Sequence, residues 1–356
     1  MLKILFVVIA VSFLTIVRSQ NINNPESVEY DAANDRYLVS NRANPVSIQS
    51  LVPGETPTLF ATGVSSPAGL EILNGKLWVC DGGNMKSFDL STGALVNTIN
   101  VGGSFLNGIT SDGSQFLFVS DFSANKIYRI NTLTLTSNVM VNSTGTQPNG
   151  MWYDGSNNRL LFVSWGTSAP IKAVSLADSS VSIITTTNLG NVDGIARDGA
   201  GRYYVSSWSQ SGVFRFDSDF TNQQQVLSGV TQGADIYYNT TNDTLVIPRT
   251  SGDVVTFHNF STAASVDLSE VSDLRIFPNP TSDQLVVYMD KSFSDGDIHL
   301  ELFTSEGQSV FLSKIDENSI VEGSFQLDTR SLAEGTYLIK VQGKNHIWSK
   351  TISVIR

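Results

Sequence analysis

Apolar and polar positions alternate in a pattern that repeats along the first three quarters of the chain. Each repeat begins with a turn such as Pro148-Asn149-Gly150, followed by an apolar residue that opens a short strand. This apolar residue returns at intervals of 42, 39, 42, 44 and 41 residues, at Val28, Leu70, Ile109, Met151, Ile195 and Ile236. A period near forty residues indicates a repeat architecture.

Each repeat contains the pattern of several strands. A second strand ends in a sequence such as Phe118-Val119-Ser120-Asp121, a third strand alternates over residues 126–130, and a Thr- and Val-rich fourth strand usually follows, as at 182–187. Runs of this composition between Gly, Asn and Asp turns are typical of β-strands. Six repeats of four strands predict an all-β, six-bladed β-propeller over residues 21–270. Residues 263–268 form a weak last strand, and residues 21–24 are the alternative for completing the sixth blade.

Residues 1–20 have the pattern of a secretory signal peptide. Lys3 lies near the start, residues 4–17 are largely apolar, and Arg18-Ser19-Gln20 ends the segment. A membrane anchor is the alternative, but the run is short for a span and no similar segment follows. We therefore expect export, cleavage after Ser19 or Gln20, and no stable membrane span.

The repeat pattern stops near residue 270. Strand-like runs then lie at 284–289, 298–303, 324–327, 337–341 and 348–354, separated by turns such as Ala333-Glu334-Gly335. This irregular spacing predicts a small β-sandwich over residues 271–356.

This C-terminal stretch resembles the sorting domain of the type IX secretion system of certain Gram-negative bacteria. The resemblance is carried by Phe277-Pro278-Asn279-Pro280, residues 302–307, Leu332 with Gly335-Thr336-Tyr337-Leu338, and Lys350-Thr351-Ile352. It implies that the type IX machinery is a partner, that the domain is removed, and that the protein is released or attached at the cell surface. The alternative is an unrelated sandwich used for binding.

Composition and charge agree with an exported protein. Without the predicted leader, 20 basic and 33 acidic side chains remain, a net charge of −13. This sign argues against nucleic acid or anionic lipid as partners and suits a protein that binds a cation. Cys80 is the one cysteine, which excludes an intrachain disulfide, and its apolar strand favours a packed thiol over a nucleophile. We expect a monomer.

The residue before the Gly of each repeat, or before Ser27 and Asp235 where these replace the Gly, is a candidate ligand. Turns that lead into the innermost strands of a propeller open around its central channel. The six aligned positions are Glu26, Ala68, Asn107, Asn149, Asp193 and Ala234. Two carboxylates and two amides around one axis favour a hard cation such as Ca²⁺, and three His with one Cys argue against zinc or copper. The alternative is that Asn-Gly and Asp-Gly only form turns, because these residues tolerate positive φ.

These residues also resemble the motifs of the regucalcin/gluconolactonase superfamily, six-bladed propellers with catalytic Ca²⁺ in the channel. Glu26 matches the family's Glu, Asn149 its Pro-Asn-Gly asparagine, Asp193 its Asp-Gly aspartate, and Asn107 an additional asparagine. The resemblance implies calcium-dependent hydrolysis of a lactone or phosphoester, with Asp193 as catalytic base or nucleophile. Simple NHL-like repeats share the general pattern.

Other polar and aromatic residues could complete such a site. Asp235 could support the metal ligands or cap a turn. Trp165, Trp208 and Arg249 follow second strands and could line a pocket, although a Trp in a blade is more often packing. The competing functional class is a surface-displayed propeller that binds protein or glycan without catalysis.

Overall fold

The computed structural model describes residues 13–18, 22–260, 275–288, 298–304, 309–315, 320, 324–342 and 347–356. The chain divides into two compact units, residues 1–261 and 262–356. Strands dominate both units, and the helices described are two 3₁₀ turns, η1 (Gly155–Asn157) and η2 (Thr250–Gly252).

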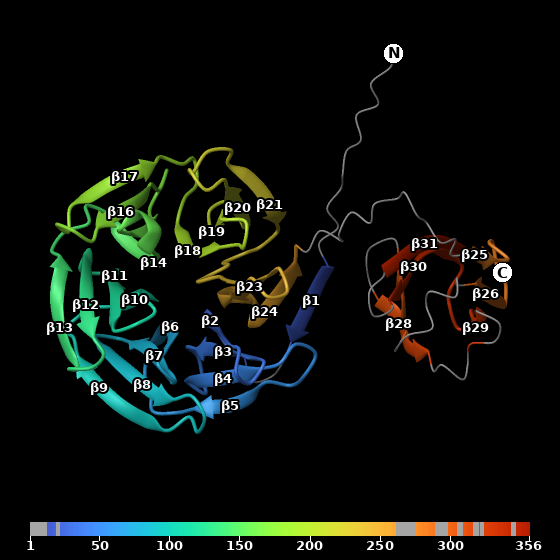
Figure 1. Ribbon diagram of the computed structural model, residues 1–356, viewed down its shortest axis with the longest axis horizontal. Helices are drawn as coiled ribbons and strands as arrows, with labels where there is room; N and C mark the ends of the chain where they lie inside the picture. The colour runs from blue at the N-terminus through green and yellow to red at the C-terminus, as the bar shows by residue number, and fades with distance from the viewer. Residues whose placement is uncertain are drawn as a thin grey trace, which may run out of the picture. The chain divides into compact units, whose positions relative to one another are not determined.

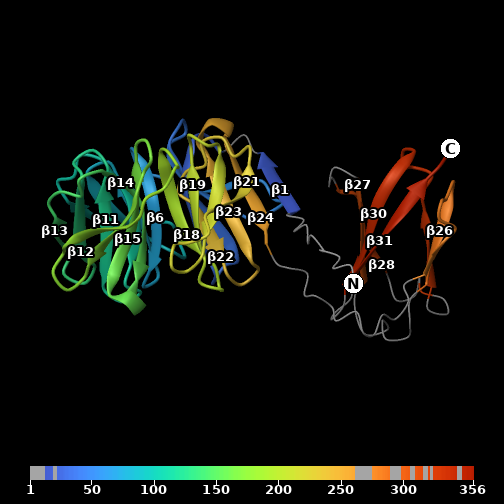
Figure 2. The ribbon, with the colours of Figure 1, turned by 90° about the horizontal axis from the view of Figure 1, so that it is seen from above.

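The first unit is the predicted six-bladed propeller. Six four-stranded antiparallel sheets are arranged around a central axis, and Figure 1 shows this arrangement along the axis and Figure 2 from the side. From the channel outward, blades one to five are β2 (Pro25–Asp31), β3 (Arg36–Asn41), β4 (Ser47–Leu51), β5 (Thr58–Ala61); β6 (Pro67–Leu73), β7 (Lys76–Asp81), β8 (Asn84–Asp89), β9 (Leu95–Asn100); β10 (Leu106–Ser111), β11 (Phe116–Asp121), β12 (Lys126–Asn131), β13 (Thr136–Val141); β14 (Gln147–Asp154), β15 (Arg159–Trp165), β16 (Ile171–Ser175), β17 (Val181–Thr185); and β18 (Val192–Arg197), β19 (Tyr203–Ser207), β20 (Gly212–Phe216), β21 (Gln224–Ser228).

The sixth blade joins the two ends of this unit. It contains β22 (Tyr237–Asn239), β23 (Thr244–Arg249), β24 (Val254–Asn259) and, on the outside, β1 (Phe13–Arg18), which pairs antiparallel with β24. Residues 22–24 form no strand, so they do not complete this blade, and residues 263–268 lie outside the described residues. Because β1 falls within the expected signal peptide, cleavage after Ser19 or Gln20 would leave β24 as an edge strand.

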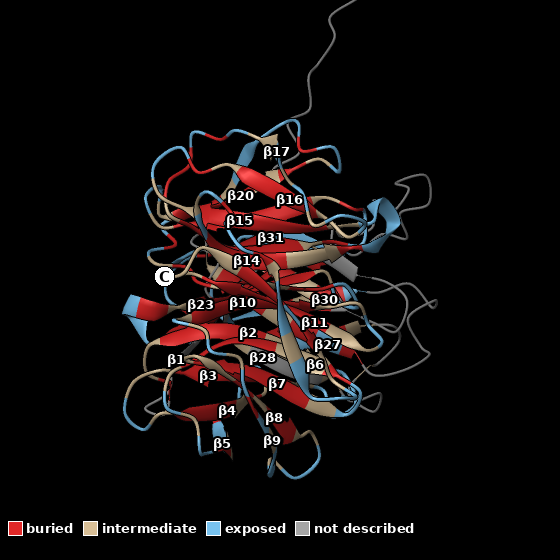
Figure 3. Ribbon diagram, turned by 90° about the vertical axis from the view of Figure 1, so that its left-hand side faces the viewer, coloured by how far each residue is buried: buried red, intermediate tan, exposed pale blue. Residues whose placement is uncertain are grey.

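The propeller core lies between the blades. Every residue of β11 after Phe116 is buried, because neighbouring blades cover both faces of its sheet. Figure 3 shows this burial along the strands, with exposure concentrated in the loops. One apolar cluster joins Trp78 of the second blade to Leu106 and Leu117 of the third. Burial on both faces explains why the second strands read as continuous apolar runs.

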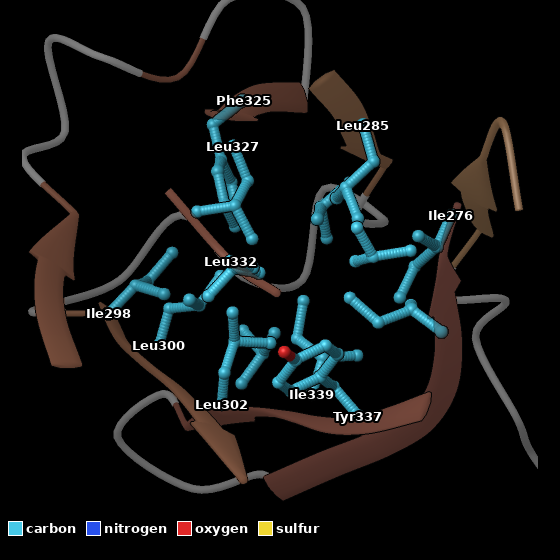
Figure 4. Packing of buried hydrophobic residues seen from close by; sticks show 14 residues of the cluster. Ile276, Leu285, Ile298, Leu300, Leu302, Phe325, Leu327, Leu332, Tyr337 and Ile339 are labelled. Atoms are coloured by element: carbon cyan, nitrogen blue, oxygen red, sulfur yellow. The ribbon is translucent and has the colours of Figure 1, made fainter. Parts of the chain in front are cut away.

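The second unit consists of two sheets around its own core. The order of the first is β25 (Arg275–Phe277), β26 (Gln284–Tyr288), β29 (Ser324–Asp328), and that of the second is β28 (Ser309–Ile315), β27 (Ile298–Thr304), β30 (Gly335–Gln342), β31 (Ile347–Val354). Side chains from both sheets, including Leu285, Leu302 and Ile339, meet in one buried cluster (Figure 4). The five predicted strands are present, and β25 and β28 are additional.

Candidate functional site

A β-bulge interrupts the innermost strand of blades one to five just before its apolar residue. In the third blade the pairing passes from Leu106 opposite Asp121 to Ile109 opposite Val119, so Asn107 and Gly108 face Ser120 alone. The corresponding pairs in the other blades are Glu26-Ser27, Ala68-Gly69, Asn149-Gly150 and Asp193-Gly194. A bulge bends the strand and redirects a side chain. The candidate ligands therefore sit at the points where each innermost strand departs from regular pleating.

The glycines of these bulges allow the next blade to approach closely. A Cβ on Gly108 would lie 2.3 Å from the carbonyl oxygen of Asn149, and one on Gly150 would lie 2.6 Å from that of Asp193. These glycines, like Gly194, do not adopt positive φ. The interpretation of Asn-Gly and Asp-Gly as positive-φ turns is therefore wrong here, because the Gly is required by packing between blades. The residue before each of these glycines therefore has no turn-forming role.

The Ser that recurs in the second strands also belongs to this inter-blade contact. The hydroxyl of Ser120 accepts a hydrogen bond from the Gly108 N–H at 2.8 Å and donates to the Asn149 carbonyl at 2.9 Å. Ser206 makes the same link from Gly194 to the next blade. Cys80 occupies this place in the second blade, where it is buried and free, and burial raises the pKa of its thiol. It is therefore a packed thiol, as expected, and not an activated nucleophile.

Four polar side chains at the bulges form a ring around the channel, here called the polar ring. Its members Glu26, Asn107, Asn149 and Asp193 are buried, with 2 to 4% of their surface exposed. Glu26 and Asn149 lie close enough to Asp193 to shift the pKa of its carboxyl. Ala68 and Ala234, at the remaining two positions, add no polar atom.

Asp193 is the least satisfied member of the polar ring. Burial raises the pKa of its carboxyl well above the usual value, and the nearby charges of Glu26 and Asp235 raise it further. Within the described part of the chain, its buried Oδ1 has no hydrogen-bond partner. Leaving a buried carboxylate oxygen without a partner is costly, so this group is stable when it holds a proton or contacts a cation.

Arg42 is a member of this site that the sequence reasoning missed. Its Nη1 lies 3.3 Å from Oε2 of Glu26, and its guanidinium stands over the ring of Phe105 at 5.2 Å. Burial still raises the pKa of Glu26, with Arg42 opposing the shift. Arg42 directly follows the second strand of its blade, close to the place of the pocket candidates Trp165, Trp208 and Arg249 in other blades, and that position was the available signal.

Four half-buried aromatic rings form an arc on the loops beside the polar ring. Phe105, Phe122, Trp165 and Trp208 contact one another in succession, with centroid distances of 6.0, 5.8 and 5.1 Å. Trp208 is fixed to the sixth blade because its Nε1 donates to the Gly233 carbonyl at 2.9 Å. The structure thus brings the two predicted Trp residues together and adds two Phe residues. Phe122 directly follows β11, as Trp208 follows β19, whereas Phe105 comes from the loop before β10.

The other two candidates have partners in the structure. Arg249 donates from Nη2 to the Gly229 carbonyl and to Thr231 Oγ1, at 3.1 and 2.6 Å, so its guanidinium holds a loop. Asp235 accepts a hydrogen bond from Ser27 Oγ at 2.8 Å, and burial raises the pKa of its carboxyl to about 7. Its position between the sixth and first blades places it beside the polar ring.

Comparisons with known proteins identify the C-terminal unit. Residues 275–355 match the family described as the secretion system C-terminal sorting domain. No curated protein matches the chain. In the part of the chain that the structure describes, no helix is long and apolar enough to cross a membrane.

Two solved structures from Bacteroides thetaiotaomicron resemble the fold. A structural genomics protein of unknown function superposes with a TM-score of 0.57 at 10% identity, over 70% of this chain and 76% of that one. A protein described as the extracellular domain of a hybrid two-component system superposes with a TM-score of 0.50 at 11% identity, over 94% of this chain. This chain spans 57% of that domain's length. The protein is thus a secreted or surface-attached β-propeller that carries a type IX sorting domain at its C-terminus.

Proposed function

We propose that the polar ring binds Ca²⁺ and that the propeller is a calcium-dependent hydrolase of a lactone or phosphoester. The observation that carries this proposal is the buried, unpartnered Oδ1 of Asp193. Glu26, Asn107 and Asn149 would supply the other protein ligands, all of them oxygen. Because Ca²⁺ takes six to eight oxygens, water or substrate would complete its shell.

The donor set fits a hard cation with a limited charge. The described residues contain no group of three or more His, Cys, Asp or Glu placed to hold a metal, and the polar ring has only two carboxylates. Its two amides are neutral oxygen donors, which suit Ca²⁺ and not a soft metal. Arg42 already offsets part of the charge of Glu26, so Asp193 is the main free anion.

The residues around the polar ring would divide the work of hydrolysis. Bound Ca²⁺ would polarise a carbonyl or phosphoryl oxygen. Asp193 would accept the proton of a water molecule or act as the nucleophile, since its raised pKa makes it a better base than an ordinary carboxylate. Arg42 could stabilise a developing negative charge, and the aromatic arc could hold the apolar part of the substrate.

A propeller that binds a ligand without catalysis is the second candidate. It is favoured by the half-exposed arc of Phe105, Phe122, Trp165 and Trp208, because such rings stack on sugars or on protein side chains. The resemblance to the regucalcin/gluconolactonase superfamily supports the hydrolase, and the sorting domain is compatible with both.

Thermal unfolding of the full chain in excess chelator and in millimolar Ca²⁺ tests the metal site. A ligand that binds only the folded state raises the midpoint by mass action. We expect a calcium-dependent rise that Asp193→Asn abolishes and that the exposed control Asp178→Asn retains. Assays with lactones and phosphotriesters then separate the two candidates.

The unfolding experiment decides whether calcium binds, and the assays decide whether the protein is a hydrolase. If Ca²⁺ does not raise the midpoint of the wild type, the polar ring is not a calcium site and the hydrolase proposal is wrong. A rise without turnover of any tested ester leaves the binding propeller.

A further inference from the structure

The other end of the channel contains a cavity that the polar ring does not explain. Its volume is about 460 Å³, within the range of small-molecule sites. Side chains that directly follow the apolar residue of the repeat line it: Glu29, Glu71, Thr110, Trp152 and Tyr237. Glu29 is three residues beyond Glu26 on β2, roughly 10 Å along an extended strand. We call this space the acidic cavity.

The carboxylates of the acidic cavity have no counter-charge. Within the described ranges, no basic side chain forms an ion pair with Glu29 or Glu71. Arg197 is the one basic residue in the lining, but its Nε donates to the Gly201 carbonyl at 3.3 Å and its guanidinium lies over Tyr203. It is thus held by its own blade.

The protein around these two carboxylates raises the pKa of both. Burial raises the pKa of Glu29 well above the usual value, and the charges of Glu71 and Asp235 add to the effect. It also raises the pKa of Glu71 to about 7, although hydrogen bonds from Ser111 oppose the shift. Glu29 has no such compensating hydrogen bond. The Glu29 side chain is partly exposed, lines the cavity and has no hydrogen-bond or ion-pair partner among the described residues.

The remaining walls are apolar and aromatic. The six apolar residues of the repeat all line the cavity: Val28, Leu70, Ile109, Met151, Ile195 and Ile236. Tyr237 lies close enough to Glu29 and Glu71 for their charges to add to burial in raising the pKa of its hydroxyl, and Trp152 lines the cavity from the fourth blade. Such a wall offers few oxygens to a strongly hydrated metal ion, whereas carboxylates with aromatic rings attract weakly hydrated organic cations.

We propose that the acidic cavity binds an organic ammonium ion. The positive nitrogen would contact Glu29 and Glu71, and the carbon substituents would pack against Trp152, Tyr237 and the apolar residues. This site differs from the polar ring in position and in ligand, so it stands whether or not the polar ring binds Ca²⁺.

Isothermal titration of the full chain with choline at pH 8 tests the proposal. The neutral analogue 3,3-dimethyl-1-butanol has nearly the same shape, so the pair isolates the charge. We expect choline to bind at least tenfold more tightly than this alcohol. The double variant Glu29→Gln, Glu71→Gln should lose at least tenfold in choline affinity, while the exposed control Asp178→Asn should bind choline like the wild type.

A titration at pH 5.5 needs no substitution and guards against a variant that fails to fold. Glu71 is protonated there, because its pKa is about 7, so choline should bind several-fold more weakly than at pH 8. Equal affinity for the alcohol and choline, or unchanged binding in the double variant, would overturn the proposal. It would also be overturned if Ca²⁺ displaced choline from the wild type and bound the cavity itself, which would make this an inorganic cation site.

Discussion

The polar ring and the acidic cavity lie at two levels of one channel, and they treat buried acid in different ways. Glu26 has Arg42 beside it, and Asp193 has the amide of Asn149. Among the described residues, neither Glu29 nor Glu71 has a basic side chain or an amide beside its carboxylate. The same innermost strands therefore present two chemistries, because successive positions of each repeat reach the channel at different depths. Asp235 connects the two levels, because its charge raises the pKa of Asp193 in the polar ring and of Glu29 and Glu71 in the acidic cavity.

The lack of a counter-charge in the acidic cavity makes the stability of the fold depend on pH. A carboxyl whose pKa is raised by folding keeps its proton in the folded state at a pH where the unfolded chain has released it. The stability linked to that proton is complete below the unfolded pKa, near 4.5 for Glu71, and is lost as the pH rises to its folded pKa of about 7. Above pH 7 the acidic cavity therefore destabilises the fold until a cation enters.

Gly108→Ala should have the largest effect, because it breaks the scaffold that both levels share. The new Cβ would lie 2.3 Å from the Asn149 carbonyl oxygen, so the third and fourth blades would have to separate. We expect a loss of about 2 to 4 kcal/mol in the free energy of unfolding. Chemical denaturation measures it, with Gly199→Ala as the control, since a Cβ at Gly199 meets no atom within 4 Å. Equal stability of the two variants would contradict the inter-blade role of the bulge glycines.

Glu71→Gln should have the next largest effect, and its sign depends on pH. At pH 8 the substitution removes a buried charge, so we expect a gain of about 1 to 3 kcal/mol in the ligand-free protein. At pH 4 the carboxyl of Glu71 is largely neutral in the folded and in the unfolded chain, so the gain should disappear. Denaturation at both pH values measures the difference, and the exposed Glu55→Gln is the control. A gain of the same size at both pH values would show that charge burial is not its cause.

The sequence predicts one level of the channel better than the other, for physical reasons. Glu26, Asn149 and Asp193 occupy a fixed place in the repeat, which for Asn149 and Asp193 precedes a Gly that packing requires, so alignment of the repeats finds them. Arg42 has a fixed place directly after a second strand, but periodicity says nothing of where its side chain points, and Phe105 comes from a loop whose length differs between blades. Glu29 could have been found as an acidic residue next to the apolar position of an innermost strand.

The N-terminal segment also shows where prediction from sequence stops. The apolar pattern of residues 4–17 is typical of a signal peptide, and an apolar strand at a sheet edge has a similar composition. Only the pairing of β1 with β24 shows that residues 13–18 can also complete a blade. Which of the two roles the segment has in the mature protein depends on cleavage, a chemical event that no strand pattern encodes.

Arg42→Gln should have the smallest effect on stability but should make the polar ring resemble the acidic cavity. Without its guanidinium, Glu26 would be buried with no cation, so we expect a loss of about 1 kcal/mol at pH 8 in chelator and none at pH 4, where Glu26 is protonated. Removing a positive charge beside the proposed Ca²⁺ ligands should also tighten Ca²⁺ binding, by up to about tenfold. Arg36→Gln is the matched control, because Arg36 pairs with Asp31 at 2.9 Å outside the polar ring. It should lower stability without changing Ca²⁺ affinity. Weaker Ca²⁺ binding in Arg42→Gln than in Arg36→Gln would mean that Arg42 organises the ligands instead of competing with the metal.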